Sequence, residues 1–141
     1  MAPTSDDPAT ALNEVLSEVI DLVQDVKQAH RKVPQTHALH AELDALSEDL
    51  RTWARLLMER DEALGVSPLE RIPSVAGRKP PNLWQGAVSD DEVRKLIDDH
   101  LERLEHHVTA ALAAQDDAGS RAALAGIEHD LLAHRAKFAA E

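Results

Sequence analysis

The chain has 141 residues and a formal charge of −11, with 15 Lys and Arg against 26 Asp and Glu. That length suits one domain, and the absence of cysteine excludes disulfides, thiolate zinc sites and cysteine nucleophiles. So acidic a chain is a poor candidate for sequence-independent nucleic-acid binding, because that binding depends on Lys and Arg neutralising phosphates.

No apolar run approaches the roughly 20 residues that cross a bilayer, and the N-terminus lacks the basic and apolar regions of a secretory signal. We therefore expect a cytoplasmic protein with no membrane partner. Only 2% of the residues are aromatic, whereas Ala, Leu, Glu, Asp and Arg are abundant. Because strands favour aromatic and β-branched residues, this composition predicts an all-α protein.

The first predicted helix opens at Pro8, where a missing amide costs nothing, and ends before Pro34. Residues 1–8 are assigned to an acidic N-terminal tail and residues 9–141 to one four-helix bundle domain. Apolar residues in the helix follow one another at steps of three and four, which predicts one buried face. They are Leu12, Leu16, Val19, Val23 and Val26, with His30 as the next step.

The second predicted helix has Thr36 as its N-cap and ends at Gly65. Its apolar face consists of Leu39, Leu43, Leu46, Leu50, Trp53 and Leu57. Residues 66–88 are rich in proline and show no steady period, and a connection of that length is uncommon between neighbouring helices. We expect this segment to carry the chain along the bundle, anchored by Leu83-Trp84, so that the second and third helices are parallel.

The third helix is predicted to start with a capping box, in which Ser89 is the cap and Glu92 follows three residues on. Its apolar positions are Val93, Leu96, Ile97, Leu101, Leu104 and Val108. The last helix is expected from about Ser120, with Leu124, Ile127, Leu131, His134 and Phe138 on one face. Four helices with one long crossover predict a ferritin-like four-helix bundle.

Eight histidines in this acidic chain provide candidate metal ligands. His40 and Asp44 are four residues apart and share a helix face, and Glu59 lies further along the same helix. With His30 they form a set of nitrogen and oxygen ligands that Fe(II) accepts. The alternative is that histidines and a solvated carboxylate stripe on the surface fall into this spacing without binding metal.

Part of the chain resembles Dps, a starvation-induced ferritin-like family. The resemblance rests on Lys27-Gln28-Ala29-His30, on Ala38-Leu39-His40-Ala41-Glu42-Leu43-Asp44, on Glu59-Arg60 and on Ala63-Leu64-Gly65. The family pattern runs roughly K-x-A-H-W-N, then L-H-E-x-L-D, then D-x-x-A-E-R and L-G. Dps proteins form hollow dodecamers, oxidise Fe(II) with peroxide and store the mineral, and some coat DNA. The family's iron site lies at a two-fold interface between subunits.

The resemblance implies that His30 and His40 of one subunit hold iron together with Asp44 and Glu59 from a neighbour. Two positions depart from the family pattern. The family's aspartate four residues before the glutamate is Arg55, which puts a fixed positive charge where a cation should bind and predicts weakened ferroxidase activity. The tryptophan after the first histidine is Arg31. The basic terminal arms of DNA-binding members are also missing, so direct DNA binding is not expected.

The remaining histidines allow a second kind of site. His100 and His134 lie on apolar helix faces, and with His30 and His40 they are candidates for binding metal or haem within one subunit. The alternative is that they are hydrogen-bonded histidines at the edge of the core. Adjacent residues on a helix diverge, so His106 and His107 are expected on a solvated face. The sequence assigns no role to His129.

The sequence therefore predicts a Dps-like homo-oligomer, either a dimer or a dodecamer, that binds and stores iron and oxidises Fe(II) with peroxide. The leading alternative is a non-catalytic ferritin-like shell or scaffold, in which Arg55 pairs with Asp44 or Glu59 and closes the iron site. The third hypothesis is metal or haem bound by histidines within one bundle. No phosphate-binding loop, serine-nucleophile elbow or zinc-protease motif is present.

Overall fold

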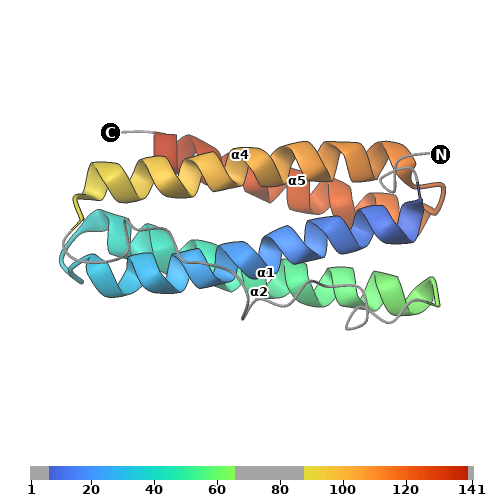
Figure 1. Ribbon diagram of the computed structural model, residues 1–141, viewed down its shortest axis with the longest axis horizontal. Helices are drawn as coiled ribbons and strands as arrows, with labels where there is room; N and C mark the ends of the chain where they lie inside the picture. Colours follow the sequence, from blue (N-terminus) through green and yellow to red (C-terminus); the bar gives the residue numbers. More distant parts are fainter. Residues whose placement is uncertain (1–6, 66–87, 140–141) are drawn as a thin grey trace.

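The computed structural model describes residues 7–65 and 88–139, which form four helices and no strand (Figure 1). The helices are α1 (Pro8–Lys32), α2 (Ala38–Ala63), α4 (Asp90–Ala114) and α5 (Ala118–Ala139). The prediction of an all-α four-helix bundle is confirmed. Leu83-Trp84 and most of the predicted N-terminal tail lie outside the described residues.

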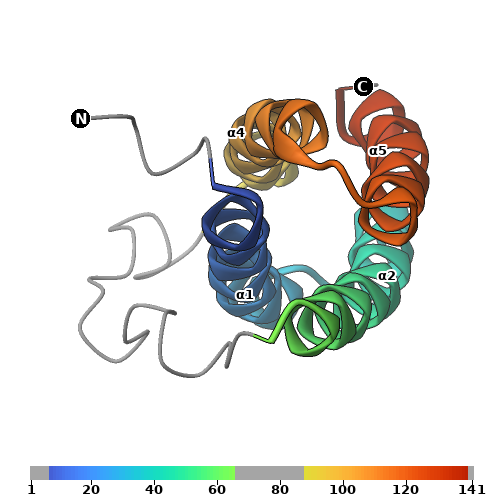
Figure 2. The same ribbon diagram turned by 90° about the vertical axis from the view of Figure 1, so that its right-hand side faces the viewer.

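The four helices surround one core in the order α1, α2, α5, α4, as the view along the bundle shows (Figure 2). Helix α1 packs against α2 and α4, and α5 packs against the same two helices from the other side. Helices α2 and α4 run in the same direction and lie diagonally opposite, so every pair of neighbours is antiparallel (Figures 1 and 2). The end of α2 and the start of α4 therefore lie at opposite ends of the bundle.

Two helices begin with the signals that the sequence predicted. Pro8 is the first residue of α1, and the carboxylate of Asp7 accepts a hydrogen bond from the backbone N–H of Thr10 at 3.0 Å. Ser89 and Glu92 form the predicted capping box at α4, each accepting from the other's backbone N–H at 3.1 and 2.9 Å. These side chains satisfy amide groups that have no partner within the helix.

The other two helices begin at different residues from those expected. The N-cap of α2 is His37 rather than Thr36, and it makes no side-chain capping bond. Its Nδ1 instead lies 2.9 Å from Oδ2 of Asp90, which ties the α1–α2 connection to the start of α4. Helix α5 begins two residues before Ser120, because the Asp117 carboxylate accepts from the Ser120 backbone N–H at 2.8 Å and so caps the first turn.

The predicted apolar faces form the core. Trp53 is 2% exposed and the core leucines of α2 are fully enclosed. Val23 and Leu96 pack at the margin of the core rather than inside it. A few polar side chains share the interior, among them Asp25, His100 and His134. None of the described helices is both long and apolar enough to pass through a membrane.

Candidate metal centre

Three side chains with metal-binding atoms meet where α1 turns into α2. His30 lies in the last turn of α1, and the short connection of residues 33–37 brings it beside His40 and Asp44 at the start of α2. One ligand atom of each residue lies within 4.8 Å of the ligand atoms of the other two. Within residues 7–65 and 88–139, this is the only group of three or more such residues that meets this distance.

The Asp44 carboxylate is shared by the two imidazole rings. His30 Nε2 lies 2.6 Å from one carboxylate oxygen, and His40 Nδ1 lies 3.5 Å from the other. The ring centroids are 3.9 Å apart and the ring planes are inclined by 41°. Because His40 and Asp44 are one turn apart on α2, the backbone itself holds them on the same face. Two nitrogen atoms and one carboxylate thus point into a single small region.

The cluster lies at the boundary between the protein and solvent. The His40 side chain is 13% exposed, His30 is 38% exposed and Asp44 is 61% exposed. His30 Nε2 is covered by protein atoms, yet its approach to Asp44 lacks the direction of a hydrogen bond, and no other described group bonds to it. Its short distance to Asp44 therefore reflects proximity rather than a directed bond, and the nitrogen keeps its capacity to bind a ligand.

The chemistry of this donor set fits a first-row transition metal. Two imidazole nitrogens and one carboxylate are the protein ligands of many non-haem Fe(II) sites, which leave further positions for other ligands. The tilt of the rings and the exposure of Asp44 allow small side-chain rotations to bring the three donors around one ion. The three residues therefore fit iron, and the same set also accepts zinc.

Glu59, the fourth predicted ligand, is not part of this cluster within one chain. It is exposed on α2, fifteen residues beyond Asp44, which corresponds to about 22 Å along the helix. Within a single chain, Asp44 lies with His30 and His40, and the expectation that a neighbouring subunit supplies Asp44 stays a prediction. Arg55 is also exposed, and it pairs with neither Asp44 nor Glu59 in the part of the chain that the structure describes.

The two buried histidines have their own carboxylate partners. His100, 2% exposed, has Nδ1 2.7 Å from Asp25 on α1, and its Nε2 lies 3.8 Å from Glu18. His134 on α5 has Nε2 2.6 Å from Asp49 on α2. The structure thus agrees with the hydrogen-bonded alternative for both residues. Asp49 is nine residues beyond His40, about 14 Å along α2, so His134 does not join the cluster of His30 and His40.

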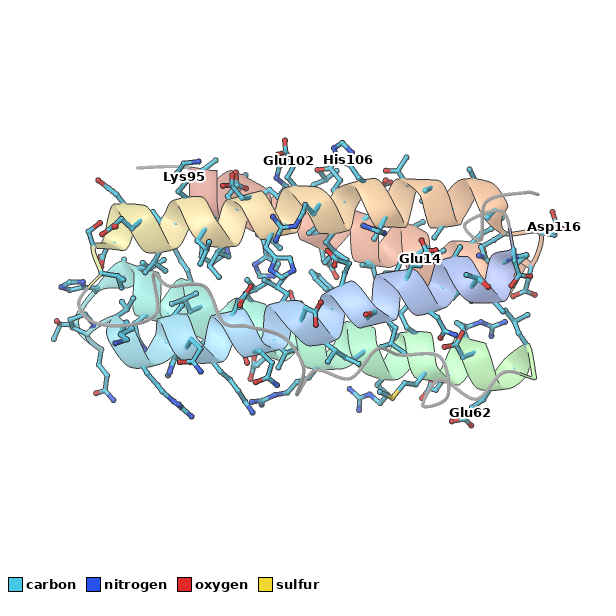
Figure 3. The ribbon with its side chains drawn as sticks, viewed as in Figure 1. Glu14, Glu62, Lys95, Glu102, His106 and Asp116 are labelled. Atoms are coloured by element: carbon cyan, nitrogen blue, oxygen red, sulfur yellow. The ribbon has the colours of Figure 1, made fainter. Side chains whose placement is uncertain are left out.

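The remaining histidines lie on the surface. His106 and Glu102 point away from the bundle on the outer side of α4, as expected for a solvated face (Figure 3). His107 is half-buried, with Nδ1 3.9 Å from Glu14. His129 is exposed on α5. None of them belongs to a group of three ligands within the described ranges.

Sequence reasoning did not identify the acidic partners of the buried histidines. Asp25 precedes Val26 on α1 and falls on the same buried side as Leu22 and Ala29. An acidic residue on an apolar face was the available signal, because a buried carboxylate needs a donor. That donor comes from α4, which the sequence pattern alone did not place beside α1.

The chain matches no protein-family model, and no curated protein is similar to it in sequence.

Proposed function

We propose that this protein is a ferritin-like bundle of the Dps type that binds Fe(II) at His30, His40 and Asp44. In this proposal iron is the cargo and the substrate, and the assembled protein is a homo-oligomer. A second copy of the chain contributes Glu59 to each site, because Glu59 lies too far along α2 to reach the cluster of its own chain. Peroxide is the oxidant.

The observation that carries this proposal is the convergence of two imidazole rings on one carboxylate. An ordinary surface ion pair needs one ring, and a second ring 3.9 Å away crowds a region that already holds a donor. A metal ion gives all three side chains a common partner. The parallel course of α2 and α4 supports a ferritin-like connectivity, since ferritin-like bundles have one long crossover.

In the proposed reaction iron supplies the electrons and the protein supplies the binding site. Two Fe(II) ions supply one electron each to hydrogen peroxide, which with two protons gives two molecules of water and leaves two Fe(III) ions. The chain's part is to hold Fe(II) through His30, His40 and Asp44 and to leave positions open. Arg55 is expected to slow this reaction, because a guanidinium stays charged at any relevant pH and repels a cation.

Peroxide-dependent oxidation of Fe(II) tests the proposal. We expect the wild-type protein to oxidise Fe(II) faster than a protein-free blank, and His40→Ala to reduce the rate to that of the blank. The matched control is His106→Ala, which removes an exposed histidine from α4 and should leave the rate unchanged. A wild-type rate equal to the blank, together with no binding of Fe(II) in an anaerobic titration, removes the proposal.

Arg55→Asp separates the ferroxidase from the non-catalytic shell or scaffold. If iron binds to the wild-type protein but oxidation appears only in Arg55→Asp, the natural protein is the non-catalytic relative. The mass of the particle in solution is the second measurement. A monomer at micromolar concentration contradicts a site completed by a second copy.

A further inference from the structure

A cavity of about 210 Å³ opens beside the cluster of His30, His40 and Asp44, between α1 and α2. Its lining consists of Val26, Lys27, His30, Arg31, Asp44, Ser47 and Arg51. Three of these residues are long cations and one is a hydroxyl donor, against a single carboxylate. In a chain of charge −11, this local excess of positive charge is unusual.

The cations of this cavity are unpaired, unlike others in the protein. Within the described ranges, none of Lys27, Arg31 and Arg51 forms an ion pair. By contrast, Arg94 lies 2.7 Å from Glu42, and Arg135 bridges Asp98 and Glu105. The hydrogen bond to Asp98 raises the pKa of Arg135 above its usual range. Arg135 is thus satisfied by the protein itself, whereas the three cations at the cavity keep their donors available.

The spacing of these residues along α1 and α2 places their side chains on the lining of the same cavity. Lys27 and Arg31 are one turn apart on α1, and Ser47 and Arg51 are one turn apart on the facing side of α2. Since a water molecule occupies about 30 Å³ in the liquid, the cavity has room for a small ion and part of its hydration shell. Guanidinium groups suit the planar pairs of oxygens that phosphate presents.

We propose that this cavity binds a tetrahedral oxyanion of the phosphate class, and that bound metal at the adjacent cluster strengthens the binding. The cavity and the cluster share His30 and Asp44. In the metal-free protein the Asp44 carboxylate opposes an anion, whereas a divalent cation on Asp44 cancels that charge. The coupling between metal and oxyanion rests on the proposed function. The cationic cavity itself does not depend on that proposal. By linkage, phosphate strengthens metal binding by the same factor.

Free phosphate is favoured over the backbone of a nucleic acid. The cavity is small, and the acidity of the whole chain disfavours an extended polyanion. The cations also lie around one half-open cavity rather than along a stripe that could follow a strand. The ligand is therefore a discrete ion.

Isothermal titration with inorganic phosphate tests the inference, using metal-free protein and protein loaded with one equivalent of Co²⁺. We expect Arg51→Gln to weaken phosphate binding by at least about tenfold. We expect the same loss in the double variant Lys27→Gln with Arg31→Gln. The control is Arg103→Gln, which removes an exposed arginine of α4 and leaves phosphate binding unchanged. Equal binding to the wild type and to Arg51→Gln, or no binding to the wild type in either form, overturns the proposal.

The titrations with Co²⁺ distinguish failure of this inference from failure of the proposed function. Co²⁺ should tighten phosphate binding by about fivefold or more, and phosphate should tighten Co²⁺ binding equally. If phosphate binds at Arg51 while Co²⁺ does not bind at all, the proposed function fails and the oxyanion site stands. If Co²⁺ binds with no effect on phosphate, the coupling is overturned. Displacement of phosphate by a short DNA duplex at lower concentration overturns the assignment to a free ion.

Discussion

Two groups of histidines and carboxylates in this bundle have opposite ratios of imidazole rings to carboxylates. In the interior, one ring faces two carboxylates, since His100 has Asp25 on one nitrogen and Glu18 near the other. At the α1–α2 turn, one carboxylate faces two rings, since Asp44 lies 2.6 Å from His30 Nε2 and 3.5 Å from His40 Nδ1. The interior group gives its histidine protein partners on both sides. In the outer group His30 Nε2 lies close to the carboxylate but makes no directed hydrogen bond to it.

This difference shows why residue type alone does not reveal a metal site. Both groups combine histidine with acidic residues on facing helices, and both are anchored by α1. The interior group is closed around its ring, because His100 is 2% exposed and its Nδ1 lies 2.7 Å from Asp25. The outer group is open and retains a nitrogen without a hydrogen bond. We therefore expect the first to govern stability and the second to govern binding.

The largest expected effect is the loss of stability on breaking the interior group. His100→Ala leaves Asp25 without its partner and opens a cavity in the core, so the free energy of unfolding should fall by about 3 kcal/mol. For a chain of this size that corresponds to a decrease in Tm of roughly 10 °C. Urea and thermal unfolding followed by circular dichroism measure it. His106→Ala on the same helix is the control, and a loss below about 1 kcal/mol for His100→Ala contradicts the prediction.

The next effect is stabilisation by metal, which should depend on the outer group alone. At a free Co²⁺ concentration about 100 times the Kd, binding to the folded state raises the free energy of unfolding by about 2.7 kcal/mol. We expect this increase in the wild type and in His100→Ala, and none in His40→Ala, whose metal-free stability stays within about 1 kcal/mol of the wild type. Differential scanning calorimetry with and without Co²⁺ makes the comparison. An increase that persists in His40→Ala places the metal elsewhere.

The smallest effect concerns a carboxylate outside both groups, at the start of α5. Hydrogen bonds from Ser120 lower the pKa of Asp117 below its ordinary value of 3.8, and Arg60 Nη2 lies 2.6 Å from it. A lowered pKa in the folded state contributes stability above the ordinary pKa, and that contribution disappears as the pH falls through the folded value.

Asp117→Asn should therefore lower Tm slightly at neutral pH, and the difference from the wild type should shrink as the pH falls below 3.8. Thermal unfolding over a pH series measures it. Asp116→Asn is the matched control, because Asp116 is the exposed neighbour at the same turn (Figure 3). A difference between Asp117→Asn and the wild type that does not change with pH contradicts the assignment.

The fold was largely predictable from the sequence because its signals are local. The apolar spacing of α2 and the capping box at Ser89 depend on residues within a turn or two of each other. The start of α2 was less predictable, because the His37 side chain contacts Asp90 on α4. A cap that depends on a distant residue leaves no local pattern.

The candidate site was predictable in part for the same reason. His40 and Asp44 share a helix face by spacing alone, and the short connection brings His30 beside them. The spacing of Glu59 and Asp44 gave the angle between them around α2 but not their proximity. Two residues on similar faces of one helix can still lie far apart along its axis. The pairing of His100 with Asp25 and the cavity at Arg51 depend on how α1 packs against other helices, which the spacing of one helix does not reveal.

The alternating direction of neighbouring helices has an electrical consequence for the turn between α1 and α2. Each end of the bundle presents two helix N-termini and two C-termini, so the partial charges of the four macrodipoles largely offset one another there. The potential at the His30 and His40 rings is then governed by ionised side chains. Exchanging single surface charges near Asp44 should tune ion preference in small, additive steps.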